Sequence, residues 1–321
     1  MSNRNPLFRC PRSALSVLVL LTAAPAVAAA PKAPPASQPA VKAQRVFVCG
    51  HSFHVFVARP LEELAGAAGI SGHVNAGVQF IGGSSVTQHW NVPDARNRAK
   101  QAAAAGKIDV LTLSPAWLMP DPAIDKFVEL ALKHNRDVRV VVQQSWSAWD
   151  GLLPPNRITR NEQRDGVTIA QLRPPLELMR KGIEAQLRAI NGKLGRQVVF
   201  LAPVGDAVLL LREKVIAGQA PGITKQSQLF RDPIGHGTEP VQRLAAYVHF
   251  AVVYRRSPVG LRVFQKPGND DWNRLNRLLQ QLAWQAVQAR PLSGMGGAPD
   301  LVAGEAEDDG TPVRASVRPR R

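Results

Sequence analysis

The sequence predicts an α/β fold of three layers, with about five parallel strands in the middle and helices on both faces. Short apolar runs rich in β-branched residues alternate with longer segments of helical period. Such runs are typical of strands buried on both faces, and their alternation with helices favours parallel pairing. With 321 residues, of which 45% are hydrophobic and 20% charged, the chain can bury a sizeable core.

The five predicted strands cover residues 45–49, 74–81, 109–113, 138–143 and 198–202. Helical patterns cover 57–68, 94–105, 121–134, 176–194 and 206–216, and two further helices, 241–254 and 271–289, close the fold. Right-handed crossovers would bring the carboxyl ends of all strands to one edge, where sites of this architecture form. The long polar segment 146–172 interrupts the pattern, either as an active-site lid or as a surface excursion.

The N-terminus predicts export. Residues 1–28 contain three arginines, an apolar run and the sequence Ala26-Val27-Ala28, as in a signal peptide. An uncleaved anchor is the alternative, although the run is short for a membrane span. Residues 29–44 are predicted to form a Pro/Ala-rich tether, 45–292 one domain, and 293–321 a disordered tail. We therefore expect a secreted or periplasmic bacterial protein with no stable membrane span after cleavage.

The formal net charge of +16 could indicate a polyanionic partner, but the arginines are scattered along the chain. We therefore expect no specific nucleic-acid partner. No phosphate-binding glycine motif is present, and no cofactor is expected. After cleavage only Cys49 would remain, so the core has no internal disulfide.

The first predicted strand leads into CGHSF, residues 49–53, and places Ser52 at the edge of the sheet. A serine there could be a nucleophile if a base and oxyanion donors lie nearby, or simply a helix N-cap. Cys49 is the other candidate nucleophile, but alternation in the strand turns it away, as a small buried residue. His51 and His54 could share a metal on a helix, but no acidic or cysteine partner is near, and no metal is expected.

Two later segments contain residue types that could complete a catalytic site with Ser52. In RDPIGHG, residues 231–237, His236 follows Asp232 in a loop before a helix, which suits a base and its carboxylate partner; a turn with a solvated histidine is the alternative. Gly82 and Gly83 let backbone amides approach a bound oxygen, or form a tight turn between strand and helix.

Together these segments resemble the blocks of the SGNH (GDSL-type) hydrolase superfamily, in the order serine, glycine, aspartate and histidine. The resemblance covers about residues 45–290. It implies a flavodoxin-like fold and serine ester hydrolysis, for which an acyl group on a carbohydrate or a small ester is the favoured substrate. It also implies Ser52 as nucleophile, His236 as base, Asp232 as its partner, and the N–H groups of Ser52 and Gly83 (or Gly82) as oxyanion donors.

Two departures from the superfamily pattern stand out. Asp232 precedes His236 by four residues instead of three, an extra residue that Gly235 could absorb. The asparagine that donates to the oxyanion is missing after the third strand, which continues as LSPAW, residues 113–117. We expect the Ser114 hydroxyl, or Gln143 or Gln144, to replace it. Losing one donor typically lowers kcat by about 10²–10³, so the alternative is a non-catalytic relative that binds a glycan or a cell-envelope component.

Overall fold

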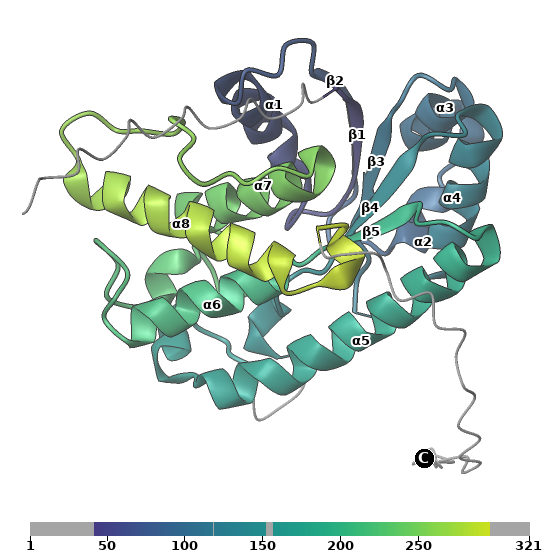
Figure 1. Ribbon diagram of the computed structural model, residues 1–321. Helices are drawn as coiled ribbons and strands as arrows, with labels where there is room; N and C mark the ends of the chain where they lie inside the picture. Colours follow the sequence, from purple (N-terminus) through teal and green to yellow (C-terminus); the bar gives the residue numbers. More distant parts are fainter. Residues whose placement is uncertain (1–41, 118, 152–156, 296–321) are drawn as a thin grey trace, which may run out of the picture. The chain divides into compact units, whose positions relative to one another are not determined.

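The computed structural model describes residues 42–117, 119–151 and 157–295. Its centre is a five-stranded sheet, parallel throughout, in the order β2-β1-β3-β4-β5 (Figure 1). The strands are β1 (Arg45–Gly50), β2 (Val74–Phe80), β3 (Val110–Leu113), β4 (Arg139–Gln143) and β5 (Val199–Ala202). The predicted α/β fold with five parallel strands is therefore confirmed, and this strand order is that of flavodoxin-like proteins.

Helices cover both faces of the sheet, as three layers require. One face packs against α1 (Ala58–Ala67), α6 (Val204–Ile216), α7 (Glu239–Tyr254) and α8 (Asp270–Gln288). The other packs against α3 (Arg98–Ala104), α4 (Pro122–His134) and α5 (Ile169–Leu194), with the short α2 (Val86–Trp90) beside them. Short 3₁₀ helices are η1 (Val55–Val57), η2 (Asp94–Arg96), η3 (Ala148–Asp150), η4 (Asn161–Gly166), η5 (Gln226–Leu229) and η6 (Pro291–Ser293).

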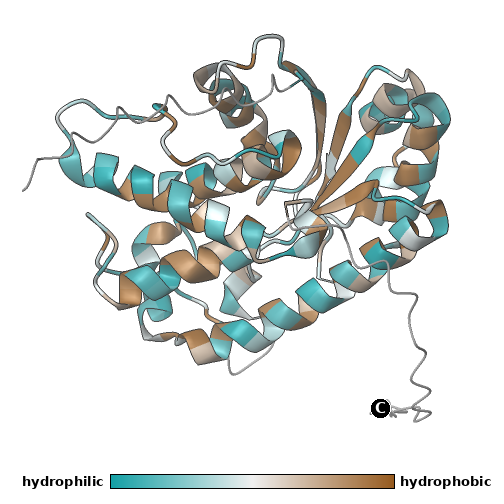
Figure 2. Ribbon diagram, viewed as in Figure 1, coloured by the Kyte–Doolittle hydropathy of each residue, from teal (hydrophilic) through white to brown (hydrophobic). Residues whose placement is uncertain are grey.

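Alternation along the strands divides the core in two. In β1, Val46 and Val48 face the cluster with α7, whereas Phe47 and Cys49 face the cluster with α4. The strands are almost wholly hydrophobic in Figure 2, while α5 and α8 mix hydrophobic and hydrophilic residues. Twelve residues of α7 are buried. Because a buried large apolar side chain contributes about 1.5–3 kcal/mol, α7 is a major source of stability.

The helices differ from expectation in three places. The helix α5 begins at Ile169, not at 176, although it contains Pro174 and Pro175. A capping box of Thr168 and Gln171 starts it, and the prolines remove hydrogen bonds only near its N-terminal end, while its later turns pack on the sheet. The predicted helix 94–105 is divided into η2 and α3, because Asn97 ends one and caps the other. The unpredicted α2 starts at a second capping box, Ser85 with Gln88.

The ends of the folded region differ slightly from expectation. The predicted leader and the tether as far as residue 41 lie outside the described residues, as does the predicted tail from 296. Gln44 already belongs to the sheet region, since its carbonyl accepts a bond from Val74 N. Ser293 is buried and its hydroxyl donates to the Val287 carbonyl. In the described part of the chain, no helix is both long and apolar enough to cross a membrane.

Asp121 fixes the starts of two helices beside the sheet. It is the N-cap of α4, where Oδ1 accepts from Ala123 N at 3.2 Å. Its Oδ2 accepts from Val86 N at 2.7 Å, and its Oδ1 from the Thr87 hydroxyl at 2.6 Å, at the start of α2. One buried carboxylate thus satisfies donors on two elements.

We expect Asp121→Ala to lower the free energy of unfolding by about 2–3 kcal/mol, because buried donors on both helices lose their acceptor. Urea unfolding followed by circular dichroism measures this. The exposed Asp137→Ala is the control, expected to stay within about 0.5 kcal/mol of the parent. Equal stability of the two variants would contradict the double-cap role.

Candidate active site

The carboxyl ends of four strands bring the candidate residues to one edge of the sheet. Ser52 follows β1, Gly82 and Gly83 follow β2, and Ser145 follows β4. The residues after β3 include Trp117. Successive strands are added on one side of β1 and then, from β3, on its other side, and ligand sites of doubly wound sheets form at this switch point.

Ser52 lies in a turn that continues directly from β1. The turn closes when His54 N donates to the His51 carbonyl at 2.9 Å. Gly50 permits this geometry, because a Cβ there would lie 2.5 Å from His54 Nδ1 and 3.0 Å from Ser114 Cβ. The tight end of β1 therefore sets the direction of the Ser52 side chain.

His236 joins Ser52 to Asp232. The distance from His236 Nε2 to Ser52 Oγ is 2.9 Å, and that from His236 Nδ1 to Asp232 Oδ2 is 2.6 Å. An ionised carboxylate only accepts, so Nδ1–H donates to Asp232 and Nε2 accepts the Ser52 hydroxyl. The structure thus brings these three predicted residues into one hydrogen-bonded series.

The four-residue spacing fits this series because of Gly235. Its φ of 102° lies in the region that glycine tolerates. Asp232 Oδ1 then accepts from the backbone N–H groups of Gly235 at 2.9 Å and His236 at 3.1 Å. Burial raises the pKa of Asp232, but hydrogen bonds from the His236 ring and from these two amides outweigh it and hold the pKa below its usual value.

The turn after β2 offers backbone donors to the same place. The N–H groups of Ser52 and Gly83 have no protein acceptor among the described residues, as oxyanion donors require. Gly83 has a φ of 61°, which favours glycine. Below it, the Ser84 hydroxyl donates to the Ile81 carbonyl at 2.9 Å and lies 2.8 Å from His89 Nε2, so buried contacts hold the turn.

The side chains expected to replace the missing asparagine all have other partners. Ser114 is fully buried, with its Oγ 3.0 Å from His51 Nε2 and 3.3 Å from Ser145 Oγ, and it does not line the cavity at Ser52. Gln143 donates to the Phe53 carbonyl at 2.9 Å. Gln144 donates to Asp206 at 3.3 Å.

An apolar cavity of about 450 Å³ opens beside Ser52 and His236. Aromatic and aliphatic side chains supply most of its wall, including Phe53, Phe80, Trp117, Trp146, Trp149 and Ile234. Phe53 stacks on Trp146 at 4.6 Å between ring centres. Trp117, Trp146 and Trp149 therefore line the cavity, whereas Trp90 packs on Phe127.

Segment 146–172 is attached to the loop that carries His236. Trp146 Nε1 donates to the Gly235 carbonyl and Trp149 N to the Ile234 carbonyl, both at 2.9 Å. Trp149 and Asp150 have φ values of 52° and 57°, which are costly for residues other than glycine and need surrounding contacts to hold them. The first part of the segment thus forms cavity wall.

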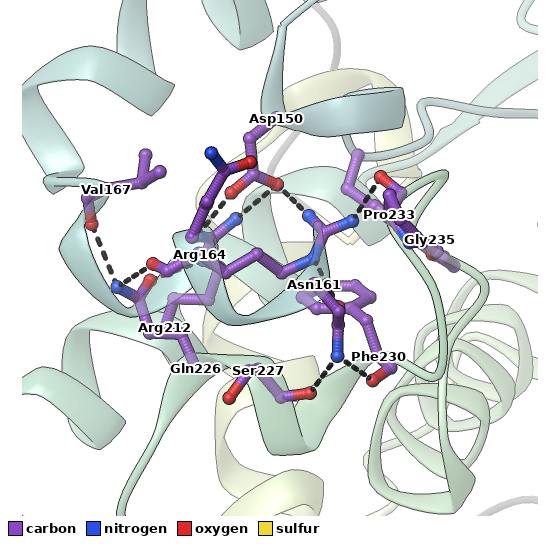
Figure 3. A network of polar contacts seen from close by, with 12 residues as sticks. Asp150, Asn161, Arg164, Val167, Arg212, Gln226, Ser227, Phe230, Pro233 and Gly235 are labelled. Carbon is purple, nitrogen blue, oxygen red and sulfur yellow. Dashed lines mark hydrogen bonds and ion pairs between the residues drawn. The ribbon is translucent and has the colours of Figure 1, made fainter. Parts of the chain in front are cut away.

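A buried charge cluster contacts the same loop at Pro233 (Figure 3). Asp150 accepts from Arg164 and, through both oxygens, from Arg212 at 2.9 and 2.7 Å. Arg164 also donates to the backbone carbonyls of Pro233 at 2.8 Å and Asp232 at 3.2 Å. Burial lowers the pKa of Arg164 to about 10, and Asp150 partly offsets this, so the guanidinium stays charged near neutral pH.

Sequence reasoning missed this cluster. Arg164 looks like a solvated charge on a polar segment, Arg212 looks like a solvated charge on a helix, and Asp150 precedes a glycine as turn residues do. Only the spacing of Arg212 among the apolar positions of α6 gives a weak signal of burial.

Cys49 and His54, the other candidates, are both buried in the core. Burial raises the pKa of the Cys49 thiol far above its usual value, which makes it a poor nucleophile. Among the described residues, no group of three or more His, Cys, Asp or Glu side chains could hold a metal.

Four buried histidines surround the end of β1. Burial is the main cause that lowers the pKa of His51 and His89 to about 4, that of His249 to about 3, and that of His54 well below 6.5. They are therefore neutral in the folded protein near pH 7.

We expect stability to fall as pH decreases from about 6.5 to about 4. In this window the unfolded chain binds protons that the folded protein excludes, and each such proton costs about 1.4 kcal/mol per pH unit. Above pH 7 these groups add no pH dependence. Urea unfolding between pH 5 and 7.5 measures the slope. His249→Gln should reduce it and the exposed His134→Gln should not; equal slopes would contradict the assignment.

Comparisons with known proteins find similarity at the level of solved structures. No family model matches the chain, and no curated protein does. A DUF4886 family protein from Bacteroides uniformis has 17% identity and a TM-score of 0.48, covering 76% of this chain and 94% of that one. A candidate SGNH hydrolase from Slackia heliotrinireducens has 20% identity and a TM-score of 0.40, and the match covers 65% of this chain and 98% of that one. A candidate GDSL-like lipase from Parabacteroides merdae has 13% identity and a TM-score of 0.40, and the match covers 66% of this chain and 95% of that one. Two of these names are those of the superfamily that the sequence resembles, but the identities are too low to transfer residue roles.

Proposed function

We propose that the chain is a serine ester hydrolase in which Ser52 is the nucleophile, His236 the general base and Asp232 the carboxylate partner. The observation that carries this proposal is the hydrogen-bonded series from Ser52 through His236 to Asp232 beside an apolar cavity. The lowered pKa of Asp232 supports it, because an ionised carboxylate orients the imidazole and stabilises the imidazolium.

The first half of the reaction transfers the acyl group to the enzyme. Ser52 Oγ attacks the ester carbonyl carbon while its proton passes to His236 Nε2. The carbonyl oxygen becomes an oxyanion, which the N–H groups of Ser52 and Gly83 stabilise. The carbon–oxygen bond to the alcohol then breaks, and His236 returns the proton to the leaving oxygen.

Water completes the cycle. His236 Nε2 accepts a proton as the water oxygen attacks the acyl carbon, and the second oxyanion occupies the same donors. The bond to Ser52 Oγ breaks, Ser52 recovers its proton from His236, and the carboxylic acid leaves. The chain's own residues supply every proton transfer.

The apolar cavity wall favours an ester whose acyl group is itself apolar. Apart from the site residues, the described lining offers mainly rings and alkyl groups, with few groups to bind a polar acid. A cavity of about 450 Å³ has the volume of about 15 water molecules, at about 30 Å³ each in the liquid. We propose that the alcohol part of the ester is a carbohydrate. We also propose that the protein is exported to the periplasm or secreted.

A non-catalytic binding role is the second candidate, because the asparagine donor is missing. It requires no contact between His236 and Ser52. The distance of 2.9 Å between Nε2 and Oγ favours hydrolysis instead.

We expect wild-type protein to hydrolyse p-nitrophenyl acetate and to be labelled by a fluorophosphonate at Ser52, since both reagents need an activated hydroxyl. Ser52→Ala should abolish both. Peptide mapping of the labelled protein identifies the modified residue.

Ser257→Ala, a serine change away from the cavity, is the matched control and should label like the parent. Hydrolysis by Ser52→Ala at the wild-type rate, or a label on another residue, would overturn the assignment of Ser52.

We expect kcat/KM to rise from acetyl to longer acyl esters of p-nitrophenol, because a longer chain buries more apolar surface at about 0.8 kcal/mol per CH₂. Ala116→Leu, which fills part of the cavity, should reduce activity on the longer esters several-fold more than on acetate. Ala104→Leu on the exposed side of α3 should change neither. An acetate optimum in the parent would contradict an acyl-binding role for the cavity.

A further inference from the structure

Ser145 directly follows β4 and is the second serine, besides Ser52, among the described residues that line the cavity. It lines the cavity together with Ser52, Gly83 and His236, and its side chain is otherwise buried. Two neighbours, Ser114 and Gln143, lie within hydrogen-bond distance of Ser145 Oγ. Their donor and acceptor roles determine the direction of the Ser145 hydroxyl proton.

On one side, the series begins at His51. Phe53 N donates to His51 Nδ1 at 3.2 Å, so Nδ1 carries no proton and Nε2–H is the donor. Burial lowers the pKa of His51 to about 4, which keeps the ring neutral in this tautomer. Nε2–H then donates to Ser114 Oγ at 3.0 Å.

On the other side, Gln143 has a fixed orientation. Its Nε2 lies 2.9 Å from the Phe53 carbonyl, which can only accept, so the amide nitrogen faces that oxygen. His249 Nε2 lies 2.9 Å from Gln143 Oε1, in agreement. Gln143 Nε2 therefore donates its second proton to Ser145 Oγ at 2.7 Å.

Between the two serines one contact of 3.3 Å must serve two hydroxyl protons. Either Ser114 donates to Ser145, or the reverse, and the other proton has no acceptor among the described residues. Ser114 is fully buried and does not reach the cavity, so an unpaired donor there would carry the full desolvation cost. Ser145 lines the cavity, where water or substrate can accept. The lower-energy arrangement has Ser114 donating to Ser145.

We infer that the Ser145 hydroxyl, which accepts from Ser114 and Gln143, donates its own proton into the cavity and is a third oxyanion donor beside the N–H groups of Ser52 and Gly83. The inference rests on the proposed ester hydrolysis. The two accepted hydrogen bonds fix the hydroxyl and strengthen it as a donor. The residue thus does from the end of β4 what the resemblance assigns to an asparagine after the third strand.

The test is Ser145→Ala with p-nitrophenyl butyrate. We expect kcat to fall about 10²–10³-fold with little change in KM, because the donor acts on the transition state. An alkyl trifluoromethyl ketone, which forms a tetrahedral oxyanion on the serine, should lose affinity by a similar factor. Ser147→Ala is the matched control, since this buried serine does not line the cavity at Ser52, and both quantities should stay near wild type.

Ser145→Thr keeps a hydroxyl and should retain at least ten times the kcat of Ser145→Ala. A kcat of Ser145→Ala within threefold of wild type, or equal loss in the Thr and Ala variants when both unfold in urea like the parent, would overturn the inference. If Ser145→Ala does not fold, the Thr variant decides through its ketone affinity, which must stay within about tenfold of wild type. A wild-type protein no faster than Ser52→Ala is a different result and removes the proposed function itself.

Discussion

The arrangement of the site depends on one buried carboxylate, that of Asp150. Two guanidinium groups share it, so the cluster carries an excess positive charge inside the protein. Carbonyl groups and a ring compensate the excess: Arg164 donates to two backbone carbonyls, and its guanidinium lies 4.4 Å from the centre of the Phe230 ring. Removing one member of such a buried pair typically costs about 3–5 kcal/mol, so the cluster is held as a unit.

Because Arg164 donates to the carbonyls of Asp232 and Pro233, the cluster fixes the loop that carries His236 and Asp232, the proposed base and its partner. The same loop also accepts hydrogen bonds from Trp146 and Trp149, in the segment that contains Asp150. The imidazole of His236 is thus positioned by elements that follow β4 and β5, while the serine depends on the close packing at the end of β1. The two parts meet at the hydrogen bond between His236 and Ser52 and at Phe53, whose ring stacks on Trp146.

The parts of this structure that the sequence predicts are those with local signals. Most strands are short apolar runs, β2 being the most polar, and all five lie close to their expected bounds. Ser52, Asp232 and His236 were identifiable because their order along the chain resembles a known superfamily. Interactions that join distant segments were not predictable. Ser145 acquires its direction from His51, Ser114 and Gln143, which lie on three strand ends. The start of α5 was misplaced because two prolines look like a helix boundary, whereas a capping box and packing outweigh them.

The contact between Ser52 and His236 joins residues 184 positions apart in the chain. The base also lies immediately before α7, a helix with most of its surface buried between the sheet and α8. Contacts of this separation pay a large loop-closure entropy and depend on the elements between them. Ser52, the proposed nucleophile, therefore gains its contact with His236 only when nearly the whole domain has assembled, and an unfinished chain carries a serine without this partner.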